Sequence, residues 1–316
     1  MPKFSVIVAV GSNFGYIDKC AKECLKLPEL RELFVVPDVP LPKKYPDKRV
    51  KIVVSGKIPP GEKRDLVAKK ASGKFLAFID DDAYPSKQWL SEAEKLFADE
   101  SVAAAGGPAV TAPEDSFLQR ASGFVYSSPL CSGGYDLRYV PRKLQECDDI
   151  PSVNLIVRKT DFEKAGGFGS KYWPGEDTKL CHDLALLGKK LVYSPKVLVY
   201  HHRRGLFLAH LGQVKNYAFH RGFFAKKFPK TSLRPAYFLP TLMLLAGFGF
   251  AALSFYVAFF AQALALLAAI YLGASFAFGF SKEGVKMGAY VALGTLLTHI
   301  VYGIYFPIGL LSPTRN

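Results

Sequence analysis

The most constraining feature of this chain is the near absence of charge from residue 236 onward. In that part the charged residues are Lys282, Glu283, Lys286 and Arg315. The apolar stretch 236–280 is roughly twice as long as the about 20 residues that a helix needs to cross a bilayer. It therefore predicts two transmembrane helices in a tight hairpin, with the turn between residues 254 and 262. A buried core helix is the alternative, but such length without charge argues against it.

The membrane segments divide the chain into two predicted domains. Residues 1–228 are predicted to form a globular domain, and residues 229–316 a transmembrane region with spans at 236–256, 258–280 and 288–311. Residues 1–235 carry +12 of the net charge of +14, and basic residues lie before the first span and after the second. Because an excess of Lys and Arg is typical of cytoplasmic loops, the expectation is a multi-pass protein of the cell membrane with a cytoplasmic domain 1–228. The tail after Leu311 is then expected outside.

The distribution of charges and cysteines argues against a nucleic-acid-binding protein, a zinc protein and a transporter. The basic residues lie beside the membrane segment and form no recognised nucleic-acid reading motif, so membrane lipids are the expected partner and nucleic acid is not. The apolar run 4–10 is too short for a signal peptide and is followed by polar residues, so none is expected. The five cysteines show neither a CxxC pair nor zinc spacing, so free thiols are expected. A transporter is disfavoured because the spans contain no charged residue that could mark an ion path.

Residues 206–228 mix apolar and aromatic side chains with Lys215, Arg221, Lys226 and Lys227. This composition is typical of an interfacial helix that lies on anionic lipid headgroups. A basic face packed against the globular domain is the alternative. Either arrangement would hold an active site close to the membrane.

The globular part begins with strands and helices in alternation, which predicts a mostly parallel α/β sheet covered on both faces. The expected strands are 4–10, 33–36, 50–54, 75–79, 102–105, 152–158 and 190–200. The expected helices are 16–27, 62–71, 87–99 and 178–187. Residues 112–151 are rich in Ser, Gly, Pro and Tyr and are expected to be irregular.

Three consecutive acids, Asp80, Asp81 and Asp82, directly follow the apolar strand 75–79. Like charges this close repel one another, and ligands of open α/β sheets bind at the carboxyl ends of the strands. A divalent cation would relieve the repulsion, and Mg²⁺ and Mn²⁺ prefer oxygen ligands. The triplet thus predicts a metal site, with a solvated polar turn as the alternative.

Further candidates lie elsewhere in the chain. Glu176 and Asp177 open the expected helix after Trp173 and Gly175, and they either cap that helix or present a general base to a pocket. Lys63 and Arg64 either meet a diphosphate or are surface charges. His201 and His202 end a strand, where a histidine could complete a metal shell, touch phosphate or simply face solvent.

The motifs FLAFIDDDAYPSKQWL at 75–90 and NLIVRKTDFEKAGGFGSKYWPGEDTKLCHDL at 154–184 occur in this order, with Gly106-Gly107-Pro108 between them. Together they resemble the inverting glycosyltransferases of family 2. The resemblance covers about residues 4–225 and implies a GT-A fold, a Rossmann-like α/β domain of the nucleotide-diphospho-sugar transferases, here with a C-terminal helical transmembrane region.

The resemblance also implies residue roles. A nucleotide-sugar donor would be bound through Mn²⁺ or Mg²⁺, with Asp177 as the base that deprotonates the acceptor hydroxyl and Glu176 beside it. The implied metal ligands are Asp80, Asp82 and His202. The implied acceptor-side residues are Asn154, Trp173 and Gly175. The implied donor-binding residues are Val10, Gly11, Asp38, Lys63, Arg64, Asp80, Asp81, Asp82 and Arg204.

Two departures from the family pattern bear on specificity. The opening strand runs into Gly11-Ser12 where many members carry a Pro-Thr-Tyr-Asn-like turn, so the nucleotide base is left open. The Gln-x-x-Arg-Trp element of processive members is missing, which favours transfer of a single sugar. A polyprenyl phosphate or another lipid-linked acceptor is expected at the cytoplasmic interface. The alternative is a membrane-bound scaffold or sensor that binds the nucleotide sugar but has lost turnover.

Overall fold

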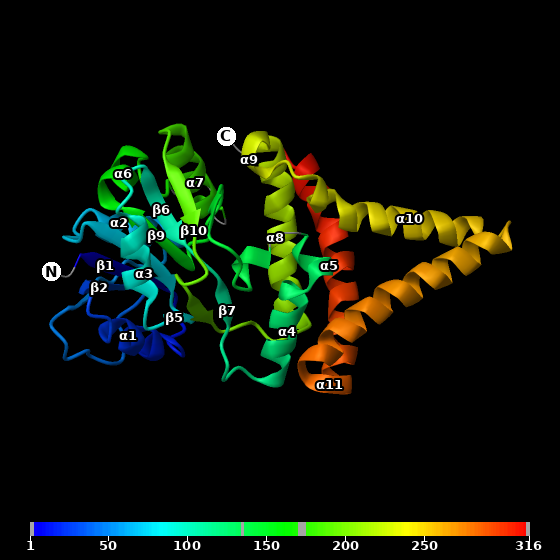
Figure 1. Cartoon of the computed structure of the whole chain (residues 1–316), viewed down its shortest axis with the longest axis horizontal. Coiled ribbons are helices and arrows are strands. Elements are labelled where there is room, and N and C mark those ends of the chain that lie inside the picture. Colours follow the sequence, from blue (N-terminus) through cyan, green and yellow to red (C-terminus); the bar gives the residue numbers. More distant parts are fainter. Residues whose placement is uncertain (1–2, 134–135, 170–174, 314–316) are drawn as a thin grey trace. The chain divides into compact units, whose positions relative to one another are not determined.

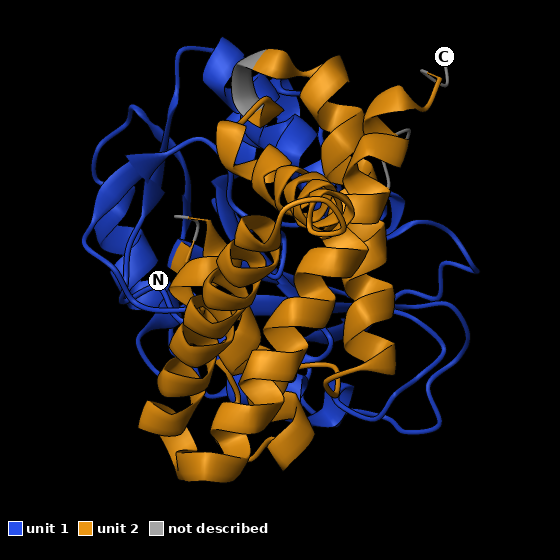
Figure 2. Cartoon of the chain, turned by 90° about the vertical axis from the view of Figure 1, so that its right-hand side faces the viewer, with its two compact units in different colours: residues 1–110, 137–202 blue, residues 111–136, 203–316 orange. Residues whose placement is uncertain are grey.

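The computed structural model describes residues 3–133, 136–169 and 175–313. The chain forms two compact units, which Figure 2 colours separately. Unit 1 comprises residues 1–110 and 137–202, and unit 2 comprises residues 111–136 and 203–316. Unit 2 therefore combines the apolar C-terminal region with residues that the sequence analysis placed in the globular domain.

Unit 1 is an α/β domain, and Figure 1 labels its elements. Its first part contains β1 (Phe4–Val10), α1 (Ile17–Leu25), β2 (Leu30–Pro37), β3 (Val50–Ile52), α2 (Pro60–Ala68), β4 (Phe75–Asp80), β5 (Ala83–Pro85), α3 (Trp89–Leu96), β6 (Val102–Gly106) and β7 (Ala109–Thr111), which ends at the first residue of unit 2. Its second part contains η1 (Asp136–Arg138), β8 (Gln145–Cys147), β9 (Asn154–Arg158), α6 (Lys159–Lys164), α7 (Glu176–Leu186), β10 (Lys190–Tyr193) and β11 (Val199–His201).

The main sheet has eight strands in the order β3-β2-β1-β4-β9-β6-β10-β8. The strands of the alternating region, β3, β2, β1 and β4, pair in parallel as predicted. β9 runs antiparallel to β4 and β6, so that Asn154 at its start lies opposite Ile79 near the end of β4. The start of β9 thus lies at the same sheet edge as the acidic triplet. A smaller sheet has the order β5-β11-β7.

Helices cover both faces of the main sheet. One face packs against α1 and α3, with Cys20, Trp89 and Leu90 fully buried. The other packs against α2, α6 and α7, where Val67 and Leu180 are buried. Strands covered on both sides need apolar residues in succession, which explains the continuous run of β1. The prediction of a doubly covered sheet is confirmed.

Two local predictions are wrong. Residues 112–151 are not irregular throughout, because they contain the helices α4 (Phe117–Ser127) and α5 (Pro129–Ser132) as well as β8. A capping box starts α4, in which Gln119 Oε1 accepts a hydrogen bond from the Ser116 backbone N–H at 3.1 Å. Residues 190–200 form two strands instead of one, since Pro195, which lacks an N–H, lies between β10 and β11.

Unit 2 is helical. Besides α4 and α5 it contains α8 (Leu208–Lys227), α9 (Pro229–Ser232), η2 (Pro235–Phe238), α10 (Leu239–Leu253) and α11 (Ala258–Leu311). The chain turns between Leu253 and Ala258, inside the predicted window. α11 is interrupted at Glu283 and Gly284, whose φ/ψ angles of −144°/30° and 79°/−165° are not helical.

Among the described residues, two helices are long and apolar enough to cross a membrane, 235–253 and 258–311. In the most apolar 18-residue stretch of each helix, only 6% and 11% of the stretch is buried. On these helices Leu245, Phe248 and Phe259 expose 63%, 74% and 66% of their surface. Core helices of soluble proteins bury such side chains, so these helices present apolar surface that needs a partner.

All five cysteines are free thiols, as predicted. Cys20, Cys24 and Cys181 are buried among apolar side chains.

Candidate functional site

The acidic triplet lies where β4 ends. Asp80 is the last residue of β4 and pairs with Ala9 of the parallel strand β1, and β5 starts directly after Asp82. The triplet therefore lies at the carboxyl edge of the parallel strands, where α/β proteins bind ligands.

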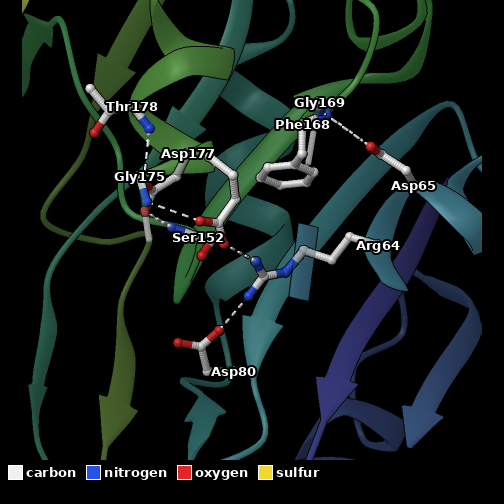
Figure 3. A network of polar contacts seen from close by, with 10 residues as sticks. Arg64, Asp65, Asp80, Ser152, Phe168, Gly169, Gly175, Asp177 and Thr178 are labelled. Atoms are coloured by element: carbon white, nitrogen blue, oxygen red, sulfur yellow. Dashed lines mark hydrogen bonds and ion pairs between the residues drawn. The ribbon is translucent and has the colours of Figure 1, made fainter. Parts of the chain in front are cut away.

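Arg64 connects this triplet to the second acidic motif. Its Nη2 donates to Asp80 Oδ1 at 2.7 Å and its Nη1 donates to Glu176 Oε1 at 3.1 Å, as the dashed lines in Figure 3 show. Arg64 and Glu176 are buried, with 3% and 5% of their surface exposed. One guanidinium thus joins carboxylates that are far apart in the sequence, and both acidic motifs belong to one site.

The N-terminus of α7 positions Asp177. Its Oδ2 accepts a hydrogen bond from the Ser152 backbone N–H at 3.1 Å, and its Oδ1 accepts one from the Thr178 N–H at 2.8 Å. Gly175 has a φ of +122°, which favours glycine, and its N–H donates to Glu176 Oε2 at 3.0 Å. Backbone groups therefore fix the direction of both carboxylates.

Four carboxyl groups of the site have raised pKa values. Burial raises the pKa of Asp80 and of Asp177, and the charge of Asp149 raises the pKa of Asp177 further. Burial and the charges of Asp82 and Asp80 raise the pKa of Asp81 to about 7. Burial, followed by the charge of Asp177, raises the pKa of Glu176 to about 7 against the influence of Arg64. Raised pKa values of clustered acids in one place are typical of functional sites.

The two histidines at the end of β11 make different contacts. β11 pairs antiparallel with β5, which brings His201 Nε2 to 3.2 Å from Asp82 Oδ1. His202 donates its backbone N–H to the Asp82 carbonyl at 2.8 Å, while its buried ring stacks on Tyr16 with 4.4 Å between the centroids. The structure therefore brings the side chain of His201 to the triplet, whereas the family resemblance pointed to His202.

Lys63 lies on α2 beside Arg64 and is equally buried. Its Nζ donates to the Val10 carbonyl at 2.5 Å and forms an ion pair with Asp38. Three of the predicted donor-binding residues, Val10, Asp38 and Lys63, thus lie together. Gly11 follows Val10 and is exposed.

The remaining predicted residues are less closely connected to the triplet. Asn154 is 1% exposed, and its side chain accepts from Trp89 Nε1 at 2.7 Å and donates to the Val197 carbonyl at 2.7 Å. Its contacts therefore hold the sheet edge in shape. Arg204 is exposed in unit 2. Trp173 lies outside the described residues.

The oxygen-rich donor set fits a hard divalent cation, although it is no preformed cage. No group of three or more His, Cys, Asp or Glu side chains that could hold a metal occurs in the described ranges. Asp80, Asp82 and the nearby His201 offer few protein ligands, which suits Mg²⁺ or Mn²⁺ because substrate phosphates and water complete their shells. Burial is the main cause of the raised pKa of Asp81, and the charges of Asp82 and Asp80 add to it. That added repulsion is what such a cation would remove.

Sequence reasoning missed Asp149 and Arg138. They form an ion pair with each other, and their charges act on Asp177. Thr178 Oγ1 also donates to Asp149, at 3.3 Å. No motif marks these residues, because they come from the stretch 137–151 that looked irregular. Ser152 was missed as well, since it acts through its backbone.

Comparison with known proteins places these observations in a family. Residues 75–282 match the family described as glycosyl transferase family group 2. The pre-mycofactocin glycosyltransferases of two Mycobacterium tuberculosis strains, CDC 1551 and H37Rv, are each 28% identical over 145 residues. The alignment covers 46% of this chain but only 30% of each relative's length.

Among the solved structures that resemble this chain, one does so over nearly its whole length. It is the mannosyltransferase PcManGT from Pyrobaculum calidifontis in complex with GDP-Man and Mn²⁺, with a TM-score of 0.66 and 17% identity. The superposition covers 96% of this chain and 86% of that one. At this identity the likeness establishes the fold, which is of the GT-A type with a long apolar helix at its C-terminal end.

Proposed function

Because the chain belongs to glycosyl transferase family group 2 and has the GT-A fold, we propose that it moves one sugar from a nucleotide-sugar donor to a lipid-linked acceptor. The reaction would take place at the cytoplasmic face of the cell membrane. The observation that carries the proposal is the bridge from Arg64 to Asp80 and Glu176, since it joins the triplet to the motif that carries Asp177.

In this proposal the triplet binds the diphosphate side of the donor. Asp80 and Asp82, with His201 next to them, would hold Mn²⁺ or Mg²⁺, and Lys63 and Arg64 add positive charge at the same edge. When bound, the cation stabilises the negative charge that develops on the departing nucleoside diphosphate. The Mn²⁺ and GDP-Man bound to the Pyrobaculum enzyme support this choice of donor and metal class.

Asp177 is the proposed general base. The two backbone N–H groups hold its carboxylate in one orientation, so that it can accept the proton of an acceptor hydroxyl. The hydroxyl oxygen then forms its bond to the anomeric carbon as the bond to the diphosphate breaks. One base and no protein nucleophile give a single displacement with inversion at that carbon.

A lipid-linked acceptor follows from the apolar surface of unit 2. The exposed side chains of α10 and of the first part of α11 favour a membrane anchor, as the sequence analysis predicted. An anchored enzyme works most readily on an acceptor that is held at the same interface, such as a polyprenyl phosphate. The absence of the Gln-x-x-Arg-Trp element supports transfer of a single sugar.

Two substitutions test the proposal. Asp177→Asn should leave donor binding unchanged but lower kcat by roughly 10²- to 10⁴-fold, the usual contribution of a general base. Asp82→Ala should weaken donor binding in the presence of Mn²⁺, measured by calorimetry with UDP and GDP sugars. Asp183→Asn, on the same helix α7, is the matched control and should behave like the parent. Transfer by folded Asp177→Asn and Asp82→Ala proteins at the parental rate would refute the proposal. Donor binding without transfer by the parent would favour the scaffold alternative.

A further inference from the structure

α11 consists of two segments with different surroundings. The break at Glu283 and Gly284 separates a proximal segment, residues 258–282, from a distal segment, residues 285–311. The proximal segment and α10 form a hairpin, and Figure 1 shows this hairpin leading away from α8 to a tip around residues 254–257. The distal segment contacts this hairpin, where Thr241 Oγ1 donates to the Gly303 carbonyl at 2.9 Å and Tyr271 Oη lies 2.7 Å from His299 Nδ1. It also packs along other helices of unit 2.

The first half of the distal segment packs against α4 and α5. Lys286 lies 4.7 Å above the ring of Phe117, and Tyr290 meets the same ring edge-on at 5.1 Å between centroids. At the break itself, Arg120 of α4 forms a bidentate ion pair with Glu283 at 2.8 and 3.0 Å.

The second half of the distal segment packs against α8. His210 Nε2 lies 2.9 Å from Thr298 Oγ1, and further along a Cβ added at Gly222 would lie 2.1 Å from the Phe306 carbonyl. At the end, Lys226 Nζ donates to the Ser312 carbonyl. Contacts thus continue from residue 283 to residue 312.

These neighbours must stay on the side of the membrane where the sheet lies. α4 and α5 lie in the chain between β7 and β8, so both ends of this excursion return to unit 1. α8 follows β11 closely and exposes Lys215 and Asn216 in its middle. A Lys at the centre of a bilayer costs about 2.5–3.5 kcal/mol, and exposed polar groups there find no water. A segment accompanied along its whole length by such helices does not cross the bilayer.

The outer face of the distal segment is nevertheless apolar. Val285, Leu293, Ile304, Ile308 and Leu311 expose between 47% and 82% of their surface. At 100° per residue these positions fall on one side of the helix, opposite the buried Val291, Thr298 and Phe306. Lys286 belongs to the distal segment itself, Lys215 of α8 lies 4.9 Å from the ring of Tyr305, and Lys226 contacts Ser312 at its end. These lysines complement anionic headgroups. An apolar face flanked by lysines is typical of a helix lying on a lipid surface.

We propose that the distal segment lies along the membrane interface while the hairpin of α10 and the proximal segment enters the hydrocarbon. This inference replaces the third span predicted at 288–311. It also places Ser312 on the same side as the sheet domain instead of outside. It rests on the membrane location in the proposed function.

Depth measurements on the full chain test the inference. Spin labels are attached to single introduced cysteines. Labels at Phe259, Leu266 and Phe280 report the depth of the proximal segment in the bilayer, and labels at Leu293, Ile304 and Leu311 report the depth of the distal segment. The protein is reconstituted in vesicles of phosphatidylcholine and phosphatidylglycerol in equal amounts, and the labelled parent is subtracted to remove signal from the native cysteines. At 1.5 Å per residue, a spanning helix would change depth by about 32 Å over the first set and about 27 Å over the second.

The expected result is graded depth along the proximal segment and uniform, shallow depth along the distal one. Graded depth along both segments would overturn the inference while leaving the membrane location intact. Uniform shallow depth at all six positions would overturn insertion of the hairpin, and the inference with it. No membrane contact at any of the six positions would overturn the membrane location as well.

Sidedness gives a second readout. In sealed vesicles, a membrane-impermeant maleimide should label Ser312→Cys and Lys87→Cys in equal fractions, because Lys87 is exposed on unit 1. The vesicles are prepared so that Lys87→Cys is labelled in clearly more or less than half of the molecules. Unequal fractions for the two positions that add up to the whole population would then place Ser312 on the opposite side and overturn the inference. Ser312→Cys that reacts only after detergent is added would overturn it too.

Discussion

At Arg64, one buried guanidinium holds two carboxylates that come from different ends of the domain. Its Nη1 and Nη2 atoms serve Glu176 and Asp80 separately, a geometry that a single ammonium group does not reproduce. The residue therefore positions both acidic motifs, in addition to the charge that it would supply to the proposed donor.

Replacing Arg64 should destabilise the domain and separate the two motifs. In Arg64→Met the two carboxylates lose their buried partner, and we expect the free energy of unfolding to fall by roughly 3–5 kcal/mol at pH 7. The loss should shrink as the pH is lowered, because protonated carboxyl groups do not need the guanidinium. Arg64→Lys should be intermediate, and Lys70→Met, an exposed position just after α2, should have little effect. Denaturant titrations of the three variants at pH 5 and pH 7 measure this, and equal loss at both pH values would contradict the explanation.

The pKa of Asp177 gives a prediction about activity. A base works as the carboxylate, so kcat/KM should fall as the pH drops through the pKa of Asp177. Burial and Asp149 raise that pKa, and the acidic limb of the pH profile should therefore lie above the ordinary value of 3.8. Asp149→Asn removes a like charge and frees Arg138, and both changes lower the pKa of Asp177. The limb should move to lower pH in this variant, whereas Asp99→Asn, an exposed acid, should not move it. A limb that stays in place in Asp149→Asn would show that another group limits the rate.

Site residues that act through their side chains could be predicted from the sequence. Residues that act through their backbone could not. The triplet, Arg64 and Asp177 were visible because charges repeat or follow apolar runs. Ser152 acts through its N–H, which no residue type reveals. The choice between His201 and His202 depends on the pairing of β11 with β5, because adjacent side chains of a strand point to opposite faces.

At the scale of elements, close packing between α8 and the distal segment of α11 depends on glycines. A Cβ at Gly309 would lie 1.8 Å from the Phe219 carbonyl, and one at Gly222 would lie 2.1 Å from the Phe306 carbonyl. In both cases the added Cβ would clash with a backbone atom of the other helix, so the helices would have to separate. Small residues with this role are common where helices meet in membrane proteins.

Gly222→Ala and Gly309→Ala should therefore lower the thermal stability of unit 2 in detergent. Gly212→Ala, on the same helix as Gly222, is the matched control because nothing lies within 4 Å of an added Cβ there. That substitution should stabilise the protein by about 0.5–1 kcal/mol, the usual gain of Ala over Gly inside a helix. Thermal unfolding measures the stability of the three variants under the same conditions. A loss of stability in Gly212→Ala equal to that of the other two variants would refute the packing argument.

The elements themselves were predicted best where hydrophobic periodicity was strong. The strands β1 and β4 and the turn between α10 and α11 appear where the sequence predicts them. α4 was missed because Ser, Gly and Pro around it concealed the signal of Ser116 and Gln119. The distal segment of α11 was predicted as a helix, but apolar composition alone does not distinguish a helix that crosses a bilayer from one that lies on it, since the difference comes from its neighbours.

For the whole molecule, the proposed membrane location raises the question whether charge or apolar surface would hold it there. The basic residues before position 236 attract anionic lipid through a force that salt screens over about 10 Å at 0.1 M. Insertion of the hairpin depends on apolar area instead and should survive salt. The two contributions can therefore be separated in one experiment.

The final prediction follows from that separation. The parent should stay bound to phosphatidylcholine–phosphatidylglycerol vesicles in high salt. A double variant with Leu245→Asp and Phe248→Asp, at positions that expose 63% and 74% of their surface on α10, should be released by the same wash. Each Asp placed deep in the bilayer costs about 2.5–3.5 kcal/mol, and two of them would lower the partition constant by several orders of magnitude.

Leu144→Asp with Leu186→Asp, equally exposed leucines of unit 1, is the matched control and should leave binding unchanged. Flotation of the vesicles measures the bound fraction, and if salt releases the parent as readily as the α10 variant, headgroup attraction alone accounts for the binding.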